Sequence, residues 1–186
     1  MSIRISGGSL KGRLIGSPHP AKGVRPTTER VKLAIFSILG DYRVQDTNVL
    51  DLYSCTGALG FEAISRGALS VDMVEKNFKN YKLIVDNVKK LEIQDGVQVH
   101  KSTVSDYLNL TKKRYGLILV DPPFDLNEWE KVLMNIGEKD ILIKEGVLVA
   151  EHPTRVFLQN NYGNLEMQDQ RKYGDSLISF FGVSDG

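Results

Sequence analysis

The sequence predicts an α/β fold in which helices cover both faces of a mainly parallel sheet. The first observation is a regular alternation of strand-like and helix-like segments from residue 47 onward. The second is that the strand-like segments are short apolar runs, which is typical of strands buried on both faces. The third is that acids stand at the carboxyl ends of three of these strands, where open α/β sheets bind ligands: Asp51, Glu75 and Asp121.

The alternating region contains five expected strands, and two more follow it. The five lie at 48–53, 70–75, 97–101, 116–121 and 146–151. Helices are expected at 58–66, 78–91 and 127–137, and in part of the region before residue 146. The stretch 164–183 reads as two strands around a turn at 172–175, and the short link requires them to be antiparallel.

The N-terminal segment differs from the rest in pattern and in charge. Residues 3–15 are expected to form a hairpin with glycines at its turn, and a helix is expected to begin near Thr27 or Thr28. Residues 1–43 carry eight basic and two acidic side chains, which leaves the segment at +6 and the remainder at −5. Such asymmetry predicts an anionic partner, although a solvated basic surface has the same composition.

The length and composition are those of a globular protein. The 186 residues are 41% apolar and 25% charged, which supports one full core. No apolar run approaches the ~18 residues of a membrane span, and the first residues lack the apolar core of a signal peptide. A single cysteine, Cys55, cannot form an internal disulfide. We therefore expect a cytoplasmic protein.

The tetrapeptide Asp121-Pro122-Pro123-Phe124 is the most informative motif. It follows an apolar run that reads as a buried strand, and two prolines end that strand because proline has no N–H for the ladder. The carboxylate is thereby held at a ligand-binding edge beside an aromatic ring that can stack on a flat group. This arrangement suits methyl transfer to the exocyclic amino group of a base, whose developing positive charge a carboxylate stabilises.

A turn between a strand and a helix, residues 50–60, predicts a nucleoside cofactor. Gly57 and Gly60 let the backbone approach a ligand, and Glu75 at the end of the next strand can accept both ribose hydroxyl protons. Cys55 stands where a dinucleotide motif has its first glycine, which disfavours a pyrophosphate. Asp51 can meet the amino group of a methionine moiety. These residues favour S-adenosylmethionine over a nicotinamide dinucleotide.

Several segments together resemble the RsmD family of ribosomal RNA methyltransferases, which act on a guanine N2 of 16S RNA. The matching segments are RISGGSLKGRLI (4–15), VRPTTERVKLAIFSIL (24–39), DLYSCTGALGFEAISRGA (51–68), DPPF (121–124) and RKYGDSLISFF (171–181). The resemblance implies a Rossmann-like class I methyltransferase. Its mainly parallel seven-stranded sheet has a C-terminal antiparallel strand. Residues 44–186 form the methyltransferase domain, and residues 1–43 form a small hairpin and helix extension.

The resemblance and the charge pattern assign roles to individual residues. The expected cofactor-binding residues are Asp51, Tyr53, Ser54, Cys55, Gly57, Gly60, Glu75 and Thr103. The expected RNA-binding residues are Arg4, Lys11, Arg13, Arg25, Thr27 and Thr28, and the basic ones are expected to lie on one face with the cofactor mouth. The chain departs from the family pattern at Ser54-Cys55, where a small Ala-Gly pair is usual. The thiol of Cys55 must therefore point away from the cofactor, or affinity suffers.

Partners and rival functions follow from the same residues. The resemblance implies 16S ribosomal RNA or a small-subunit particle as substrate, and we expect a monomer with neither a metal nor a membrane partner. A target base must be unpaired or flipped to reach such a pocket. An amino-methyltransferase acting on DNA adenine or cytosine, or on protein glutamine, uses a similar motif. A nicotinamide-dependent oxidoreductase and a non-catalytic RNA-binding protein are the rivals from other classes.

Overall fold

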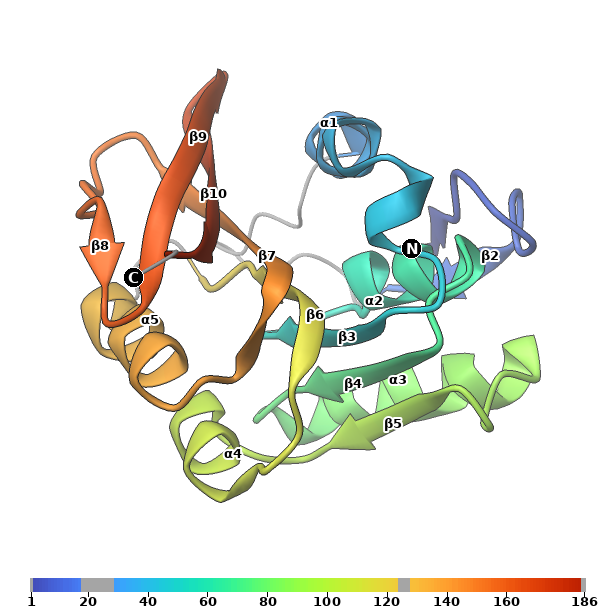
Figure 1. Ribbon diagram of the computed structural model, residues 1–186. Coiled ribbons are helices and arrows are strands. Elements are labelled where there is room, and N and C mark those ends of the chain that lie inside the picture. The colour runs from blue at the N-terminus through green and yellow to red at the C-terminus, as the bar shows by residue number, and fades with distance from the viewer. Residues whose placement is uncertain (1, 18–28, 124–127, 185–186) are drawn as a thin grey trace.

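The computed structural model describes residues 2–17, 29–123 and 128–184, and it has the expected α/β architecture (Figure 1). One sheet has the strand order β5-β4-β3-β6-β7-β10-β9-β8. These strands are β5 (Val97–His100), β4 (Ser70–Val74), β3 (Asn48–Leu52), β6 (Tyr115–Val120), β7 (Leu142–Pro153), β10 (Ser176–Val183), β9 (Leu165–Tyr173) and β8 (Asn161–Tyr162). The first five are parallel, and β10 pairs antiparallel with both β7 and β9.

Helices cover both faces of the sheet because successive strand residues point to opposite sides. One core contains apolar residues of α1 (Glu29–Leu39), α2 (Ala58–Ser65) and α3 (Phe78–Leu91). The other core contains those of α4 (Val104–Leu110) and α5 (Trp129–Glu138). On β3, Val49 faces the first core, whereas Leu50 faces the second.

The predicted class is confirmed, and three details differ from the prediction. The described sheet has eight strands rather than seven, because the two-residue β8 pairs with β9. The expected helix before residue 146 is wrong beyond Glu138: the chain enters β7 at Leu142, where the apolar run of residues 141–143 pairs with β6. The sequence reading also missed α4, a seven-residue helix too short for a clear period.

The N-terminal hairpin packs at the ends of α2 and α3. Its strands, β1 (Ser2–Arg4) and β2 (Leu14–Gly16), pair antiparallel, and Ile15 is buried in the first core. Gly16 exchanges two hydrogen bonds with the Asn87 side chain near the C-terminus of α3, at 2.9 and 3.1 Å. In parallel α/β units, each helix runs antiparallel to the strands that it connects. The hairpin therefore lies near the beginnings of β3 and β4, away from their carboxyl ends (Figure 1).

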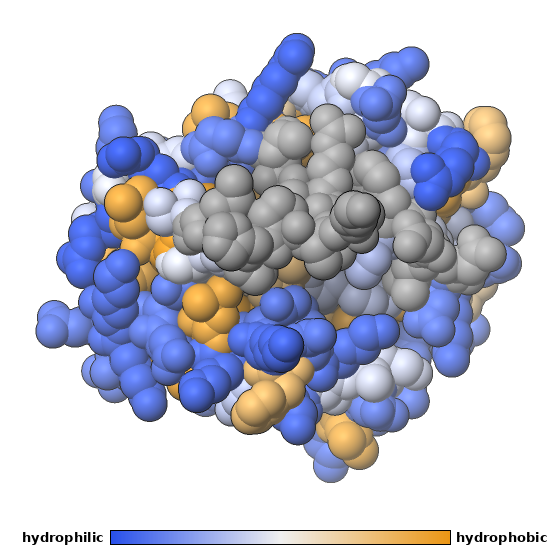
Figure 2. Space-filling view, turned by 180° about the vertical axis from the view of Figure 1, so that it is seen from behind, coloured by the Kyte–Doolittle hydropathy of each residue, from blue (hydrophilic) through white to orange (hydrophobic). Residues whose placement is uncertain are grey.

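The surface is predominantly hydrophilic. Figure 2 shows mostly polar residues on the face seen from behind, with hydrophobic residues in small separate groups. Within the described ranges, no helix is both long enough and apolar enough to cross a membrane.

Candidate active site

The turn from β3 to α2 is tightly wound. Tyr53 and Cys55 adopt φ of 61° and 50°, in the left-handed region that side chains disfavour, and Gly57 follows at 77°. Hydrogen bonds hold this conformation: Ser54 N–H donates to the Val74 carbonyl at 3.0 Å, and Gly57 N–H donates to the Ser54 carbonyl at 2.6 Å. Strained backbone of this kind persists only where the surroundings fix it, and it is frequent at ligand sites.

Asp51 is a buried carboxylate at the base of the turn. Only 2% of the residue is exposed, and its Oδ2 accepts a hydrogen bond from Gly60 N–H at 3.1 Å. A β-carbon at residue 60 would lie 2.9 Å from Oδ2 and 2.5 Å from Met73 Cε, so glycine is required there. Burial raises the pKa of Asp51 to about 7, although the Gly60 and Ser54 hydrogen bonds oppose this. A cationic ligand group beside it would restore the carboxylate.

Glu75 bridges the turn and the start of α3. Its Oε2 accepts from Cys55 N–H at 2.8 Å, and its Oε1 accepts from Asn77 N–H at 2.7 Å. Glu75 is 7% exposed. Because a carboxylate has about four acceptor positions, two remain for the hydroxyls of a ribose. The fixed orientation and the remaining acceptor capacity fit the predicted nucleoside.

Residues 121–123 follow β6 at the point where the strand order reverses. Strands β4 and β5 lie on one side of β3, and β6 and β7 lie on the other, which is where open α/β sheets bind ligands. Leu52 is in register with both Val74 and Val120, so Glu75 and Asp121 are level on either side of Tyr53. With strands ~4.8 Å apart, their backbones are roughly 10 Å apart, a separation that accommodates a nucleoside.

The pKa of the Cys55 thiol is affected by all three of these acids. The pKa of the thiol is raised to about 11, mostly by burial. The charges of Glu75, Asp121 and Asp51 contribute to the same increase, in that order of effect. Carboxylates on three strands therefore act on the thiol, whose expected orientation away from the cofactor stays a prediction. The thiol stays protonated near neutral pH, although a helix start often lowers a thiol pKa.

Other predicted cofactor residues already have structural roles. The Ser54 hydroxyl donates to the Asp51 carbonyl at 2.8 Å. The Tyr53 ring packs against the second core, and burial raises the pKa of its phenol. The Thr103 hydroxyl caps α4 by accepting from Asp106 N–H at 3.1 Å. The predicted place of Thr103 among the cofactor-binding residues stays a prediction.

The predicted RNA-binding residues are only partly described. Arg4, Lys11 and Arg13 are exposed, and Arg13 Nη2 donates to the Lys90 carbonyl at the end of α3. The hairpin packs at the C-terminal ends of α2 and α3, and the expected position of its basic residues on one face with the cofactor mouth stays a prediction. Arg25, Thr27, Thr28 and Phe124 lie outside the described residues, while Pro122 is buried and Pro123 is exposed.

Glu151 is a site residue that the sequence reading missed. It follows Ala150, which is in register with Val120, so Glu151 is level with Asp121 on the neighbouring strand. Glu151 is 4% exposed, and one of its oxygens accepts from the Ser176 hydroxyl at 3.0 Å. The rule that selected the other three acids, a carboxylate at the carboxyl end of an expected strand, applies to this one as well, because a strand was expected at 146–151.

A metal centre finds no support among the residues with described positions. No three histidine, cysteine, aspartate or glutamate side chains gather there in a way that could hold an ion.

Residues 3–182 match the family described as "Conserved hypothetical protein 95". The chain belongs to this family. It is 34% identical over 182 residues to "Putative rRNA methyltransferase YlbH" of Bacillus subtilis, covering 96% of this chain and 98% of the relative. It is 30% identical over 149 residues to "Ribosomal RNA small subunit methyltransferase D" of Escherichia coli K12, covering 80% of this chain and 74% of the relative. The predicted membership of the RsmD family is confirmed.

Solved structures show the same fold as this RsmD family member. "Putative methyltransferase yhhF from Escherichia coli" matches with a TM-score of 0.87 and 25% identity, and each chain is fully covered. A more distant structure is described as SMU.776, "a putative methyltransferase complexed with SAH". It has a TM-score of 0.68 and 17% identity over 87% of this chain and 50% of its own. The predicted cofactor agrees with that description.

Proposed function

We propose that this RsmD family member transfers a methyl group from S-adenosylmethionine to the exocyclic N2 of a guanine in 16S ribosomal RNA. The observation that carries the proposal is the convergence of Asp51, Glu75 and Asp121 around the Cys55 turn at the switch point of the sheet. Two relatives whose names include ribosomal RNA methylation support the class of substrate. S-adenosylmethionine supplies an electrophilic methyl group on its sulfonium.

Each acid has a separate task in this proposal. Asp51 pairs with the ammonium of the methionine moiety, which favours its charged form despite burial. Glu75 accepts the ribose hydroxyls from a position fixed by two backbone donors. The Asp121 carboxylate accepts a hydrogen bond from the guanine amino group and stabilises the positive charge that develops on its nitrogen. The proton then leaves to Asp121 or to solvent.

The test is mass analysis of nucleosides from small-subunit RNA incubated with the purified protein and S-adenosylmethionine. RNA from cells that lack the protein is the substrate, because its target base is unmethylated. N2-methylguanosine is the expected product. Methylation only of adenine, cytosine or a protein glutamine would assign a rival amino-methyltransferase activity. Binding of RNA without methyl transfer to any acceptor would indicate a non-catalytic RNA-binding protein and would overturn the proposal.

A further inference from the structure

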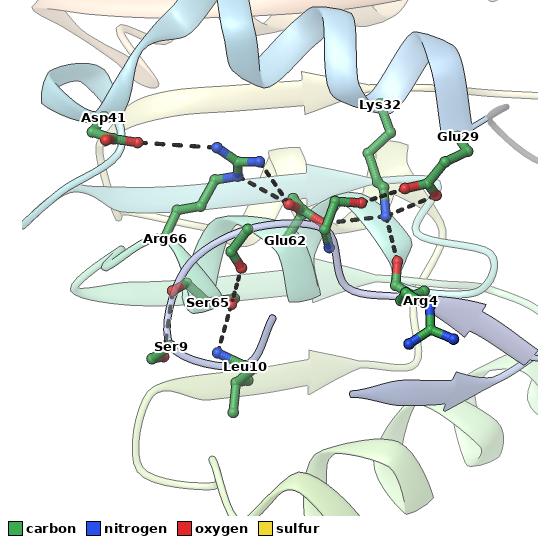
Figure 3. Close-up of polar contacts among 11 residues, drawn as sticks. Arg4, Ser9, Leu10, Glu29, Lys32, Asp41, Glu62, Ser65 and Arg66 are labelled. Carbon is green, nitrogen blue, oxygen red and sulfur yellow. Dashed lines mark hydrogen bonds and ion pairs between the residues drawn. The ribbon is translucent and has the colours of Figure 1, made fainter. Parts of the chain in front are cut away.

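A buried ion pair joins the N-terminal extension to α2. Lys32 on α1 is 2% exposed, and Glu62 on α2 is fully buried. The Lys32 Nζ lies 3.1 Å from Glu62 Oε2 (Figure 3). The same ammonium donates to the Arg4 carbonyl at 2.7 Å and lies 3.1 Å from Glu29 Oε2. One lysine therefore connects α1, β1 and α2.

The Glu62 carboxylate is the centre of this cluster. Besides Lys32, it accepts from the Ser6 N–H at 2.9 Å and from Arg66 Nε at 3.0 Å. Ser65, on the next turn of α2, accepts from the Leu10 N–H at 2.9 Å (Figure 3). The loop that carries Lys11 and connects the two hairpin strands is thus held to α2 by the side chains of Glu62 and Ser65 and by the Ser9 N–H, which donates to the Ser65 carbonyl at 2.7 Å.

The burial of these charges calls for a reason other than stability. Removing an ion pair from water costs about as much as the attraction returns, and apolar residues of similar volume often stabilise a fold equally well. The best-supported use of such a pair is to select one arrangement among several. Here the pair lies at the junction between the extension and the methyltransferase domain, so the arrangement it selects is the placement of the extension.

The helix α2 also holds the cofactor turn. Gly60, two residues before Glu62, donates its N–H to Asp51. The far ends of α2 and α3 hold the hairpin, and the 14 residues of α3 span about 21 Å at 1.5 Å per residue. The hairpin cations are therefore fixed at a distance from the reacting centre, where they can bind phosphates away from the target base.

We propose that Glu62 and Lys32 are positioning residues for RNA. They hold the hairpin so that phosphates bound by Lys11 and Arg13 bring the target base to Asp121. The inference rests on the proposed RNA methylation and adds to it how the extension aligns the substrate. Neither residue of the pair touches the reacting atoms.

The test uses the paired variant Lys32→Met with Glu62→Gln, which removes both charges and leaves neither one buried alone. Its affinity for S-adenosylhomocysteine and its unfolding temperature should stay close to those of the wild type. The salt slope of RNA binding should fall by up to ~2, as in Lys11→Gln with Arg13→Gln, because each lost phosphate contact removes ~0.9. The KM for RNA should rise more than kcat falls.

Combining all four substitutions separates positioning from general stability. If the pair acts through the hairpin, the combined variant should bind RNA no more weakly than the hairpin variant alone. Additive losses would overturn the inference. Asp41→Asn is the matched control, since Asp41 reaches the same cluster only through Arg66 at 4.0 Å and is exposed. It should leave RNA binding unchanged.

A second variant, Glu62→Asp, keeps the charge but shortens its reach, and it should raise the KM for RNA in the same direction. Failure of both variants to fold would assign the pair to folding and overturn the positioning role. An active wild type with an unaffected paired variant, or with an unaffected hairpin variant, would overturn the inference alone. If the wild-type protein methylates no RNA, the proposed function itself is overturned.

Discussion

The proposed pairing of Asp51 with the cofactor ammonium predicts pH-dependent cofactor binding, because the Asp51 pKa of about 7 lies within the physiological range. The carboxylate form is the one that pairs with an ammonium, so lowering the pH from 8 to 6 should weaken S-adenosylhomocysteine binding by about tenfold. Calorimetry across this range checks the prediction. Asp51→Asn should bind more weakly and show a flat profile, and a flat wild-type profile would contradict the assignment.

The same shift has a defined sign for stability. The folded-state pKa of Asp51 is raised above its usual 3.8, so the folded protein binds a proton more tightly than the unfolded chain between about pH 4 and 7. The contribution of Asp51 to stability therefore falls as the pH rises through that window and is constant above it. A bound ammonium offsets this loss.

Asp121 is the residue on which the proposed chemistry depends. Asp121→Ala should lower single-turnover methylation by ~10²–10³, since one preorganised charge-stabilising group is removed. Binding of S-adenosylhomocysteine should change little, because Asp121 contacts the acceptor base and not the cofactor in the proposed mechanism. Asp121→Asn is the control that separates hydrogen bonding from charge: it should be milder if only the hydrogen bond matters. Full activity in the alanine variant would rule Asp121 out.

The Cys55 thiol should react slowly with iodoacetamide. With a pKa of about 11, only ~10⁻³ of it is thiolate at pH 8, whereas an ordinary cysteine is partly ionised there. The rate should be far below that of the urea-unfolded protein, and mass spectrometry measures both. Replacing Cys55 by glycine also suits the backbone φ of 50° and should not lower cofactor affinity. A fast reaction in the folded protein would contradict the raised pKa.

At the scale of elements, the hairpin of β1 and β2 supplies exposed cations at a distance from the site. Replacing Lys11 and Arg13 by glutamine should weaken RNA binding and reduce the slope of its logarithm against salt by up to ~2. Cofactor affinity should stay unchanged, because both residues are at the far ends of α2 and α3. Filter binding over a range of salt concentrations measures the slope. An unaltered slope would mean that these cations are only solvated.

Local signals explain which elements the sequence predicted well. Helix α3 was predicted at its observed bounds, 78–91, because it has a strong apolar stripe and a cap at Asn77 that accepts from Lys79 N–H at 2.9 Å. The acids Asp51, Glu75 and Asp121 were selected because each lies at or just beyond the carboxyl end of a buried strand. Local signals fail for long-range geometry: no sequence pattern shows that the hairpin docks on Asn87, which is 71 residues from Gly16.

The conformation of the cofactor turn was also beyond the sequence. The left-handed backbone at residues 53 and 55 cannot be inferred from those residue types. The contact between Glu151 and Ser176 could not be predicted either, because Ser176 lies on a strand that inserts beside β7 from later in the chain. Both features depend on tertiary contacts rather than on the local pattern.

For the whole molecule, the position of β10 predicts that the C-terminal hairpin is indispensable. A chain ending at residue 164 lacks β9 and β10 and leaves the outer edge of β7 unpaired, and exposed edges of this kind promote aggregation. We expect it to be insoluble or unable to bind S-adenosylhomocysteine. A chain ending at residue 183 keeps every strand and is the control. Cooperative unfolding and normal cofactor binding by the shorter chain would contradict this.

The insertion of β10 between β7 and β9 also sets an order of events during synthesis. Domains begin to fold as the chain emerges from its N-terminus. The parallel strands and the cofactor turn are made first, but β7 gains its neighbour, and Glu151 gains Ser176, only after residues 176–183 leave the exit tunnel. The sheet of this proposed ribosomal RNA methyltransferase is therefore incomplete until residues 176–183 have left the ribosome.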